Sequence, residues 1–417
     1  MFLLSLVATA TLIGDFRASA VKVDITPKNT QWLMGYGARQ STGVLDTIHH
    51  RILAMDDGKG TQVFLVASDL CVFSPSVYDD FTRELEKETG IKPRQVWWTV
   101  THTHSSPELG PPGVYDVLLK GRSDHPWDRE YLALVTQALQ RGILEAREKL
   151  APARVLSGVG FSRANINRRS RDVDGTISLG LNPDGVVDTQ LGLLRVEPVA
   201  GGTPIALVAN YAMHGTVLGG RSMLVSGDGP GIVADYVEKK TGSIMLFVNG
   251  AAGNLAPIYS TLESSRGRQL SEFRVLLGDR VLETNAKLVK PMPQFTLGLD
   301  EITVETARRE GLGWPPDLAT YAAGDAGVKI PVRILRMGDT VMWGAPVELF
   351  CEIAMRVRKE SGYRNTFFFG YANGWLGYLP TAVAFQEGGY EPRTSPFTPR
   401  VEKDFGDAVV KAIRRGR

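Results

Sequence analysis

The sequence has few cysteines, few histidines and almost no net charge. Its 417 residues include 2 Cys and 6 His, and 47 Lys and Arg against 45 Asp and Glu leave a formal charge of +2. Two cysteines exclude a disulfide-rich scaffold and a cysteine-based zinc ribbon. The near-neutral charge argues against a nucleic-acid partner, which would require clustered excess Lys and Arg. Because 43% of the residues are hydrophobic, the chain can bury a core and is not a disordered polyelectrolyte.

Long hydrophobic runs are also lacking, so we expect no transmembrane segment. The apolar run at residues 2–14 is too short to cross a bilayer and is typical of a signal peptide, with Ala18-Ser19-Ala20 as an A-x-A cleavage pattern. We therefore predict a signal peptide at residues 1–20 and a secreted or periplasmic protein. Two alternatives stay open, which are cleavage after Ala10 and no cleavage, with residues 16–25 as the first strand.

Strand-like and helix-like segments alternate along the chain. Short β-branched and aromatic runs predict strands at 62–67, 95–101, 205–211, 244–249, 332–337, 340–344 and 366–371. Apolar residues three and four apart predict helices at 76–89, 128–150, 231–240, 270–288 and 348–360. This alternation predicts a single α/β domain over residues 21–417, since no repeat or linker marks a boundary. The Gly- and Pro-rich stretch 311–327 is expected to be a long loop.

Histidines follow two of the predicted strands. In Thr101-His102-Thr103-His104-Ser105, extended geometry would point His102 and His104 to the same side, because side chains alternate along a strand. Two such imidazoles form half of a zinc site, or a ligand beside a general base, and a core or surface pair is the alternative. His214 follows another strand and is either part of the same site or a hydrogen-bonded core residue.

Small or acidic residues follow other predicted strands, and each of these segments can have either a functional or a purely structural role. Residues 226–231 could bind an anion through backbone N–H groups, but a tight turn with a helix cap is favoured. Residues 249–257 would let a backbone approach a ligand closely, or would simply pack a strand end. Glu348, expected in the first turn of a helix, is either a helix-dipole residue or an oxygen ligand. Asp69 either orients a ligand histidine or caps a turn.

Taken in order, these segments resemble the catalytic domain of the neutral, non-lysosomal ceramidase family. The resemblance rests on residues 21–27 (VKVDITP), 34–36 (MGY), 68–70 (SDL), 101–105 (THTHS), 167–168 (NR), 212–216 (AMHGT), 226–228 (SGD), 249–257 (NGAAGNLAP), 346–350 (PVELF) and 378–390. It implies an α/β fold of mixed β-sheets covered by helices.

The resemblance also implies one zinc ion per chain and roles for ten residues. The implied metal ligands are His102, His214, Glu348 and Tyr378. His104 is implied to transfer protons, and Arg168 and Tyr390 to hold the substrate carbonyl or its oxyanion. The segment implied to contact substrate contributes Asn249, Gly250 and Ala256.

Two departures from the family separate this chain from ceramide-specific relatives. Ala256 stands where the family has a serine, and the family's C-terminal immunoglobulin-like domain is expected to be missing. Neither departure touches the four implied ligands.

The expected function is therefore that of a zinc-dependent amidohydrolase, ceramidase-like, that cleaves an N-acyl bond with metal-activated water. Its partner is a small-molecule or lipid amide, with transient contact to a membrane surface as an option, and the oligomeric state stays open. The alternatives are a zinc hydrolase of an ester, small N-acyl compound or acylated sugar, and a secreted binding protein with a structural zinc.

Overall fold

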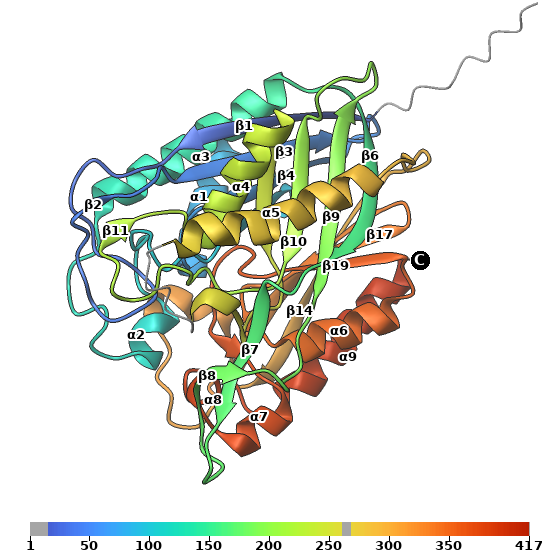
Figure 1. Ribbon diagram of the computed structural model, residues 1–417. Coiled ribbons are helices and arrows are strands. Elements are labelled where there is room, and N and C mark those ends of the chain that lie inside the picture. Colours follow the sequence, from blue (N-terminus) through green and yellow to red (C-terminus); the bar gives the residue numbers. More distant parts are fainter. Residues whose placement is uncertain (1–15, 261–267, 417) are drawn as a thin grey trace, which may run out of the picture.

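The computed structural model describes residues 16–260 and 268–416 of the chain (Figure 1). Eight strands form one mixed sheet in the order β12-β10-β9-β6-β1-β3-β4-β5. Their bounds in chain order are β1 (Arg17–Asp24), β3 (His49–Asp56), β4 (Gln62–Ser68), β5 (Val96–Val100), β6 (Ala151–Phe161), β9 (Gln190–Pro198), β10 (Ala206–Tyr211) and β12 (Ile244–Asn249). The β10–β12 and β4–β5 pairs are parallel and the other pairs are antiparallel.

A second sheet of five strands comes from the C-terminal third. It contains β14 (Leu297–Ala307), β15 (Ala322–Ala323), β16 (Gly327–Met337), β17 (Thr340–Gly344) and β19 (Asn365–Phe369). Three small sheets join β2 (Gly43–Val44) to β11 (Leu224–Val225), β7 (Asn165–Arg171) to both β8 (Ile177–Asn182) and β13 (Leu255–Pro257), and β18 (Glu348–Leu349) to β20 (Tyr378–Leu379).

The helices are α1 (Pro75–Thr89), α2 (Val114–Leu118), α3 (Arg129–Glu148), α4 (Asp228–Thr241), α5 (Gln269–Lys287), α6 (Cys351–Ser361), α7 (Ala382–Glu387), α8 (Tyr390–Arg393) and α9 (Val401–Arg415). Short 3-10 turns lie at Pro93–Gln95, Ile258–Ser260 and Pro316–Tyr321. The caps follow ordinary helix chemistry: Asp128 accepts from two backbone N–H groups at the start of α3, and Gly90 ends α1 with a left-handed φ of 75°.

The two large sheets share one apolar interior. The eight-stranded sheet bends where β1 meets β6, and β12 folds back into contact with β3, β4 and β5. Side chains of β3 point alternately to the two faces of the sheet. Leu53 and Met55 lie in the shared interior, while Ile52 and Ala54 lie in a second apolar cluster on the side of the helices. Leu335, Met342 and other residues of the five-stranded sheet complete the interior. Strands buried on both faces explain why their sequences are nearly continuous apolar runs.

Helices cover the outer faces of both sheets. In Figure 1, α3, α4 and α5 lie over the large sheet, and α6 and α9 lie over the five-stranded sheet. The side chains of α4 and α5 pack with β9 and β10 in a third apolar cluster, and α6 and α9 pack on β16 and β17. This architecture confirms the predicted α/β fold of mixed sheets covered by helices.

A buried ion network attaches α4 to the large sheet. Arg51 on β3 is 1% exposed and pairs with Asp69 at 2.7 Å, with Asp235 at 2.6 Å and with Glu238 at 2.8 Å. Lys22 on β1 pairs with Asp235 and Glu238 as well. Asp69 therefore neutralises Arg51, so the interpretation in which it orients a ligand histidine is wrong.

The strands and helices predicted from apolar patterns are present, with boundaries shifted by a few residues. One placement is wrong: Glu348 precedes α6 and lies in the short strand β18 rather than in a helical turn. The stretch 311–327 is not one long loop, because it contains a 3-10 turn and β15. The strands β3, β6 to β9 and β14 and the helix α9 were not predicted. Gly, Pro and charged residues interrupt the apolar pattern of these strands, and pairing with neighbours stabilises them.

The predicted signal-peptide boundary after residue 20 falls inside β1. Residues Arg17 to Ala20 pair in register with Asp56 to Leu53 of β3, and Ala18 is fully buried. Cleavage after Ala20 would remove half of this strand, whereas cleavage after Ala10 would leave it whole. Residues 1–15, which include most of the predicted signal peptide, lie outside the described part of the chain.

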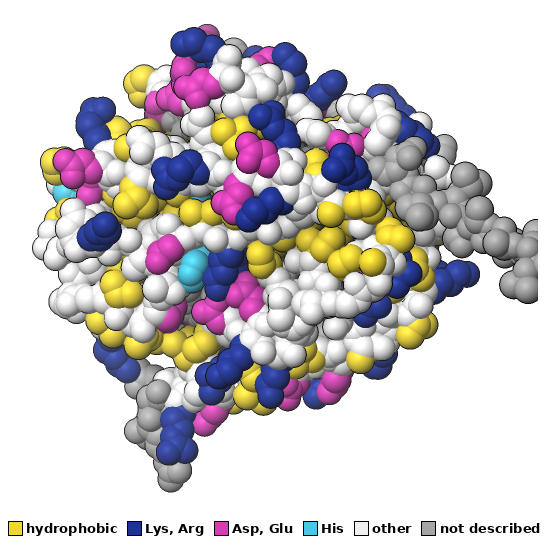
Figure 2. Space-filling model, turned by 90° about the horizontal axis from the view of Figure 1, so that it is seen from above, with side chains coloured by type: hydrophobic (Ala, Val, Ile, Leu, Met, Phe, Trp, Pro, Cys, Tyr) yellow, Lys and Arg dark blue, Asp and Glu magenta, His cyan; other side chains and the backbone are white. Residues whose placement is uncertain are grey.

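Among the described helices, none combines the length and apolar character needed to cross a membrane. Figure 2 shows one face of the molecule, on which Lys and Arg alternate with Asp and Glu and with small hydrophobic patches. On this face no field of one sign builds up, as the balanced composition leads one to expect.

Candidate metal centre and active site

The segment after β5 brings His102 and His104 together, although not in the predicted way. His102 has a φ of 62°, so the extended geometry of the strand does not continue through it. Its carbonyl oxygen accepts a hydrogen bond from the backbone N–H of Gly215, and any Cβ at Gly215 would lie 2.5 Å from that oxygen. The strained turn places the Nε2 atoms of His102 and His104 3.1 Å apart.

Backbone carbonyls orient His102 and His214. The Nδ1 atom of His102 lies 3.1 Å from the carbonyl oxygen of Cys71, and the Nδ1 atom of His214 lies 2.9 Å from that of Leu255. A carbonyl can only accept, so both Nδ1 atoms carry the proton and both Nε2 atoms present a lone pair. This is the arrangement of metal-binding histidines, whose second nitrogen is held by a hydrogen bond.

Glu348 completes a three-residue cluster of donor atoms. Its Oε2 atom lies 3.1 Å from Nε2 of His214 and 3.6 Å from Nε2 of His102. These three buried residues offer ligand atoms that all lie within 4.8 Å of one another. The parallel pair β18–β20 sets Glu348 directly beside Tyr378, whose hydroxyl lies 3.4 Å from Nε2 of His214. The structure thus brings together all four residues implied as metal ligands.

Two imidazole nitrogens, one carboxylate oxygen and a phenol oxygen are a chemically suitable set for Zn²⁺. These four residues fit a zinc ion in the structure, because backbone carbonyls hold both histidines with their Nε2 atoms toward Glu348. Burial is the main cause that lowers the pKa of His102 to about 3, and it also holds the pKa of His214 well below its ordinary value. Neutral imidazoles are the form that binds a metal.

Arg168 lies against this cluster from β7. Its Nη1 atom is 2.8 Å from Nε2 of His214, and its Nη2 atom donates to the hydroxyl of Tyr378 at 3.0 Å. The Nε–H group donates to Glu391 at 2.9 Å, so the positive charge is neutralised beside the site. Although burial opposes the charged form, Tyr378, Glu391 and Glu348 raise the pKa of Arg168, which therefore stays protonated.

His104 and Tyr390, the other two residues implied in catalysis, border the same cluster. His104 is buried, its pKa is held well below 6.5 by burial and by the neighbouring His102, and its Nδ1 has no hydrogen-bond partner among the described residues. The ring of Tyr390 lies 5.7 Å from that of Tyr378 in an edge-on arrangement. Burial raises the pKa of Tyr390, so its hydroxyl stays a hydrogen-bond donor.

Asn249, which is implied to contact substrate, lies where three strand ends meet. Its side chain is fully buried, donates to the carbonyl oxygens of Thr101 and Met213, and accepts from the Met213 N–H group. All its hydrogen-bonding atoms are therefore used to tie the ends of β5, β10 and β12 together. Asn249 positions the segments that carry His102 and His214.

Gly250 and Ala256 are also packing positions. A Cβ at Gly250 would lie 3.0 Å from that of Ala212, so a larger residue would require a small shift of one of the two segments. Ala256, 4% exposed, lies in β13 and pairs with Ile166 of β7, two residues before Arg168. The segment 249–257 thus packs against the strand ends and the strand β7 that carry the site residues.

Several residues that sequence reasoning did not assign also contact the site. Trp375 donates to Oε1 of Glu348 at 2.8 Å, and the ring of Tyr371 stacks on that of His102 with 4.2 Å between centroids. Any Cβ at Gly35 would collide with the His104 ring, so the motif at 34–36 serves close approach to that ring. Cys71 contacts His102, and both Cys71 and Cys351 are free thiols, so they do not pair.

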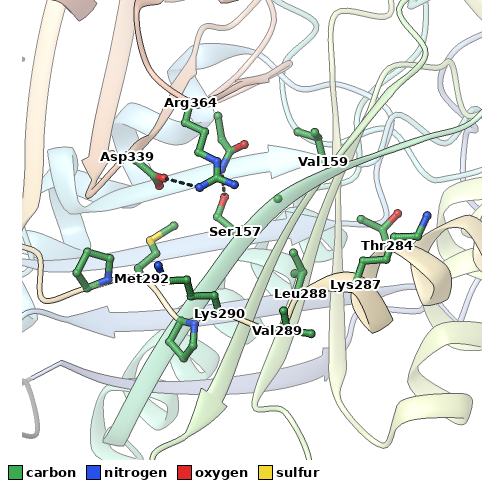
Figure 3. A pocket seen from close by; sticks show the side chains of 14 residues that line it. Ser157, Val159, Thr284, Lys287, Leu288, Val289, Lys290, Met292, Asp339 and Arg364 are labelled. Atoms are coloured by element: carbon green, nitrogen blue, oxygen red, sulfur yellow. Dashed lines mark hydrogen bonds and ion pairs between the residues drawn. The ribbon is translucent and has the colours of Figure 1, made fainter. Parts of the chain in front are cut away.

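A separate groove of about 460 Å³ lies away from these residues (Figure 3). Ser157 and Val159 of β6, the end of α5 with Thr284 and Lys287, and Arg364 line it. Arg364 points toward Asp339 across the groove at 3.8 Å. No residue implied in metal binding or catalysis lines this groove.

Fold and site together define an α/β protein that gathers two histidines, a carboxylate and a tyrosine into a candidate mononuclear metal centre. A family model, neutral/alkaline non-lysosomal ceramidase, N-terminal, matches residues 16–256. This span holds His102, His104, Arg168 and His214, whereas Glu348 and Tyr378 lie beyond it. The chain belongs to the neutral/alkaline non-lysosomal ceramidase family.

Curated relatives and solved structures agree with this assignment. The chain is 23% identical to the neutral ceramidase of Pseudomonas aeruginosa, over 95% of this chain and 71% of that protein. It is 25% identical to neutral ceramidase B of Dictyostelium discoideum, over 54% of this chain but 32% of that protein. The crystal structure of the Pseudomonas aeruginosa neutral ceramidase has the same fold, with a TM-score of 0.79, 20% sequence identity, and coverage of 96% of this chain and 74% of that one.

Proposed function

We propose that this protein is a zinc-dependent amidohydrolase that cleaves an N-acyl bond, as the family membership implies for the class of reaction. The convergence of His102, His214, Glu348 and Tyr378 beside His104 and Arg168 carries the proposal. The four proposed ligands come from four separate segments and meet at one point, with the Nε2 atoms of both histidines within 3.6 Å of one buried carboxylate oxygen, an arrangement typical of a functional site.

The four donors would hold the metal, and the neighbouring residues would act on the substrate. Bound there, Zn²⁺ supplies Lewis-acid polarisation of a carbonyl and activation of a water molecule. His104, which is neutral, accepts the proton that the attacking water loses and returns it to the leaving nitrogen. Arg168 and Tyr390 donate hydrogen bonds to the substrate oxygen as it gains negative charge, an effect worth roughly 3–4 kcal/mol per donor in comparable sites.

Ala256 is compatible with this mechanism, because water rather than a serine hydroxyl is the nucleophile. The same residues would serve a lipid amide such as ceramide or a smaller N-acyl compound, since they act on the amide group common to both.

His102→Ala tests the proposal, with His125→Ala as the control because His125 lies outside the cluster. Wild-type protein and the control should bind about one zinc ion per chain and release fatty acid from a short-chain ceramide or N-acyl amide. His102→Ala should lose both zinc and hydrolysis. Zinc content near zero in the wild-type protein, or unchanged hydrolysis in His102→Ala, would refute the proposal.

We also propose that the protein is exported with cleavage near Ala10, which keeps β1 whole. N-terminal sequencing of the protein from its native host checks this. A mature protein beginning at Val21 would contradict it, because Arg17 to Ala20 pair with β3.

A further inference from the structure

The groove of Figure 3 lies between β6, the end of α5 and the segment that follows this helix, away from the candidate metal centre. Its volume of about 460 Å³ is within the range of small-molecule pockets. Gly158 of β6 lies in its wall, and any Cβ there would lie 2.6 Å from Cδ2 of Leu288. A larger residue at this position would displace the Leu288 side chain, which is part of the same lining.

One end of the groove is polar. The Oγ atom of Ser157 accepts hydrogen bonds from the hydroxyl of Thr340 at 2.9 Å and from the side-chain amide of Asn365 at 3.0 Å. A hydroxyl has two lone pairs and one proton, so both lone pairs of Ser157 are occupied and its proton is available to a ligand. The exposed guanidinium of Arg364 lies toward the same end (Figure 3). This end can therefore donate hydrogen bonds to an anionic oxygen.

The charges around the groove favour an anion. Among the described residues that line it, Lys287, Lys290 and Arg364 are cationic and Asp339 alone is anionic. Asp339 faces Arg364 at 3.8 Å, which is too long for a hydrogen bond, so the guanidinium donors stay available. Because the whole chain carries 47 cationic and 45 anionic side chains, this excess of positive charge is local.

The rest of the lining is apolar and partly exposed. Val289 is 83% exposed and Val159 is 50% exposed, and Leu288 and Met292 lie beside them in the lining. An aliphatic ligand would remove this hydrocarbon surface from water, and the flexible Met292 side chain can adapt to its shape. A small inorganic anion would use only the polar end. The groove thus fits a ligand that joins an anionic head to an aliphatic chain.

We infer that this groove binds a medium-chain fatty acid, with its carboxylate at Ser157 and Arg364 and its chain along Leu288, Val289 and Val159. A fatty acid is also the class of product that cleavage of an N-acyl bond releases. The inference goes beyond the proposed function, because the groove lies away from the candidate metal centre and binding there requires no hydrolysis.

The test compares decanoate with decan-1-ol, which lacks the charge, and with acetate, which lacks the chain. Isothermal titration calorimetry is performed on protein that has been dialysed against 1,10-phenanthroline and then against buffer, so that no bound metal holds the carboxylate. Decanoate should bind at about one molecule per chain. Decan-1-ol should bind at least about tenfold more weakly, because it makes no charge-assisted hydrogen bond, and acetate should show no measurable binding.

Charge-removing variants locate the carboxylate. The double variant Lys290→Gln with Arg364→Gln should weaken decanoate binding roughly five- to tenfold and leave the binding of decan-1-ol unchanged. The matched control is Arg94→Gln with Lys411→Gln, which removes one exposed arginine and one exposed lysine that do not line the groove. This control should bind decanoate as the wild-type protein does.

Two further variants act on the remaining lining. Asp339→Asn should tighten decanoate binding roughly two- to threefold, because it removes the carboxylate that faces Arg364, and a loss of structure would not produce a gain of affinity. Val159→Asp should weaken the binding of both decanoate and decan-1-ol, because it places a charge beside the aliphatic chain.

Three results would overturn the inference: equal affinities for decanoate and decan-1-ol, an unchanged decanoate affinity in the double variant, or inorganic phosphate binding as tightly as decanoate. Hydrolysis assays keep the proposed function separate. If the wild-type protein cleaves no amide, the proposed function fails and the binding data still decide the role of the groove. If the protein cleaves an amide but the metal-free form does not bind decanoate, only the inference fails.

Discussion

The two oxygens of Glu348 have different partners. Oε1 accepts the indole N–H of Trp375 at 2.8 Å, while Oε2 faces the Nε2 atoms of His102 and His214 and the hydroxyl of Tyr371. A carboxylate held at one oxygen presents the other in a defined direction. Hydrogen bonds of this kind to ligand side chains typically tune metal affinity.

Trp375→Phe should weaken zinc binding by roughly 10- to 100-fold while the protein stays folded, because it removes the indole donor and keeps most of the ring volume. Competition with a coloured chelator measures the affinity. Trp314→Phe is the control, since it removes an indole hydrogen bond to Leu318 outside the cluster. Equal zinc affinities of Trp375→Phe and wild type would show that Trp375 does not orient Glu348.

At the scale of elements, buried polar contacts hold helices α3 and α4 on the large sheet. Arg51 of β3 reaches Asp235 and Glu238 of α4, and His50, its neighbour on the same strand, faces the other way. There its Nε2 atom contacts the carbonyl oxygen of Val135 on α3 at 3.0 Å, and its Nδ1 atom contacts Ser68 at 2.6 Å. Side chains alternate between the two faces of β3, so Arg51 holds α4 by ion pairs and His50 holds α3 by a hydrogen bond.

Arg51→Gln should lower the free energy of unfolding by roughly 3–5 kcal/mol, because it leaves the buried carboxylate of Asp69 without its cation. Lys22→Gln, which removes a partly exposed partner of the same α4 carboxylates, should cost about 1 kcal/mol or less. Urea denaturation measures both. Similar decreases in the free energy of unfolding of the two variants would mean that the buried Arg51–Asp69 pair contributes no more than a surface ion pair.

His50 should make the protein less stable in acid. Burial lowers its pKa from 6.5 to about 4, so the folded state binds the proton more weakly than the unfolded state. Its contribution is complete above pH 6.5 and is lost as the pH falls toward 4, by roughly 3 kcal/mol in total. His50→Gln, which keeps hydrogen-bonding groups but does not titrate, should show a correspondingly smaller loss of stability between pH 6.5 and 4. The same pH dependence in both proteins would contradict this role.

At the scale of the whole molecule, the candidate metal centre joins distant parts of the chain. His102 follows β5 and His214 follows β10, whereas Glu348 and Tyr378 come from β18 and β20, more than 130 positions further along the chain. A metal bound at this point would connect the large sheet to the segments that flank the five-stranded sheet. Because it binds only the folded chain, it would stabilise the whole fold.

Removal of zinc with a chelator should therefore lower Tm, and restored zinc at 100 times Kd should return about 2.7 kcal/mol of stability. Differential scanning calorimetry with and without chelator measures this change. His214→Ala should melt at the same temperature in both conditions, since it lacks one ligand. A wild-type Tm that does not respond to the chelator would exclude a metal link between the two halves.

Local patterns predicted the helices α1 and α3 to α6 and seven of the strands, whereas the identity of the site residues came from the resemblance to a known family. Apolar runs such as 244–249 and the stripe of α3 depend only on neighbours in the chain. The strands β7 and β8 could not be predicted, because Arg168 and Arg169 have no apolar pattern and are stabilised by Glu391, more than two hundred positions away. Glu348 was expected in a helix because its pairing with Tyr378, which lies thirty positions further along the chain, leaves no local pattern.

The amino-acid sequence by itself determined the α/β class through its local periodicity, and the resemblance of its motifs to a known family implied which residues could bind a metal. Only the tertiary structure decided how those residues meet. The positive φ of His102 and the occupied hydrogen bonds of Asn249 both depend on segments far apart in the chain. Distances, burial and counter-ions are properties of folded contacts, and no local pattern contains them.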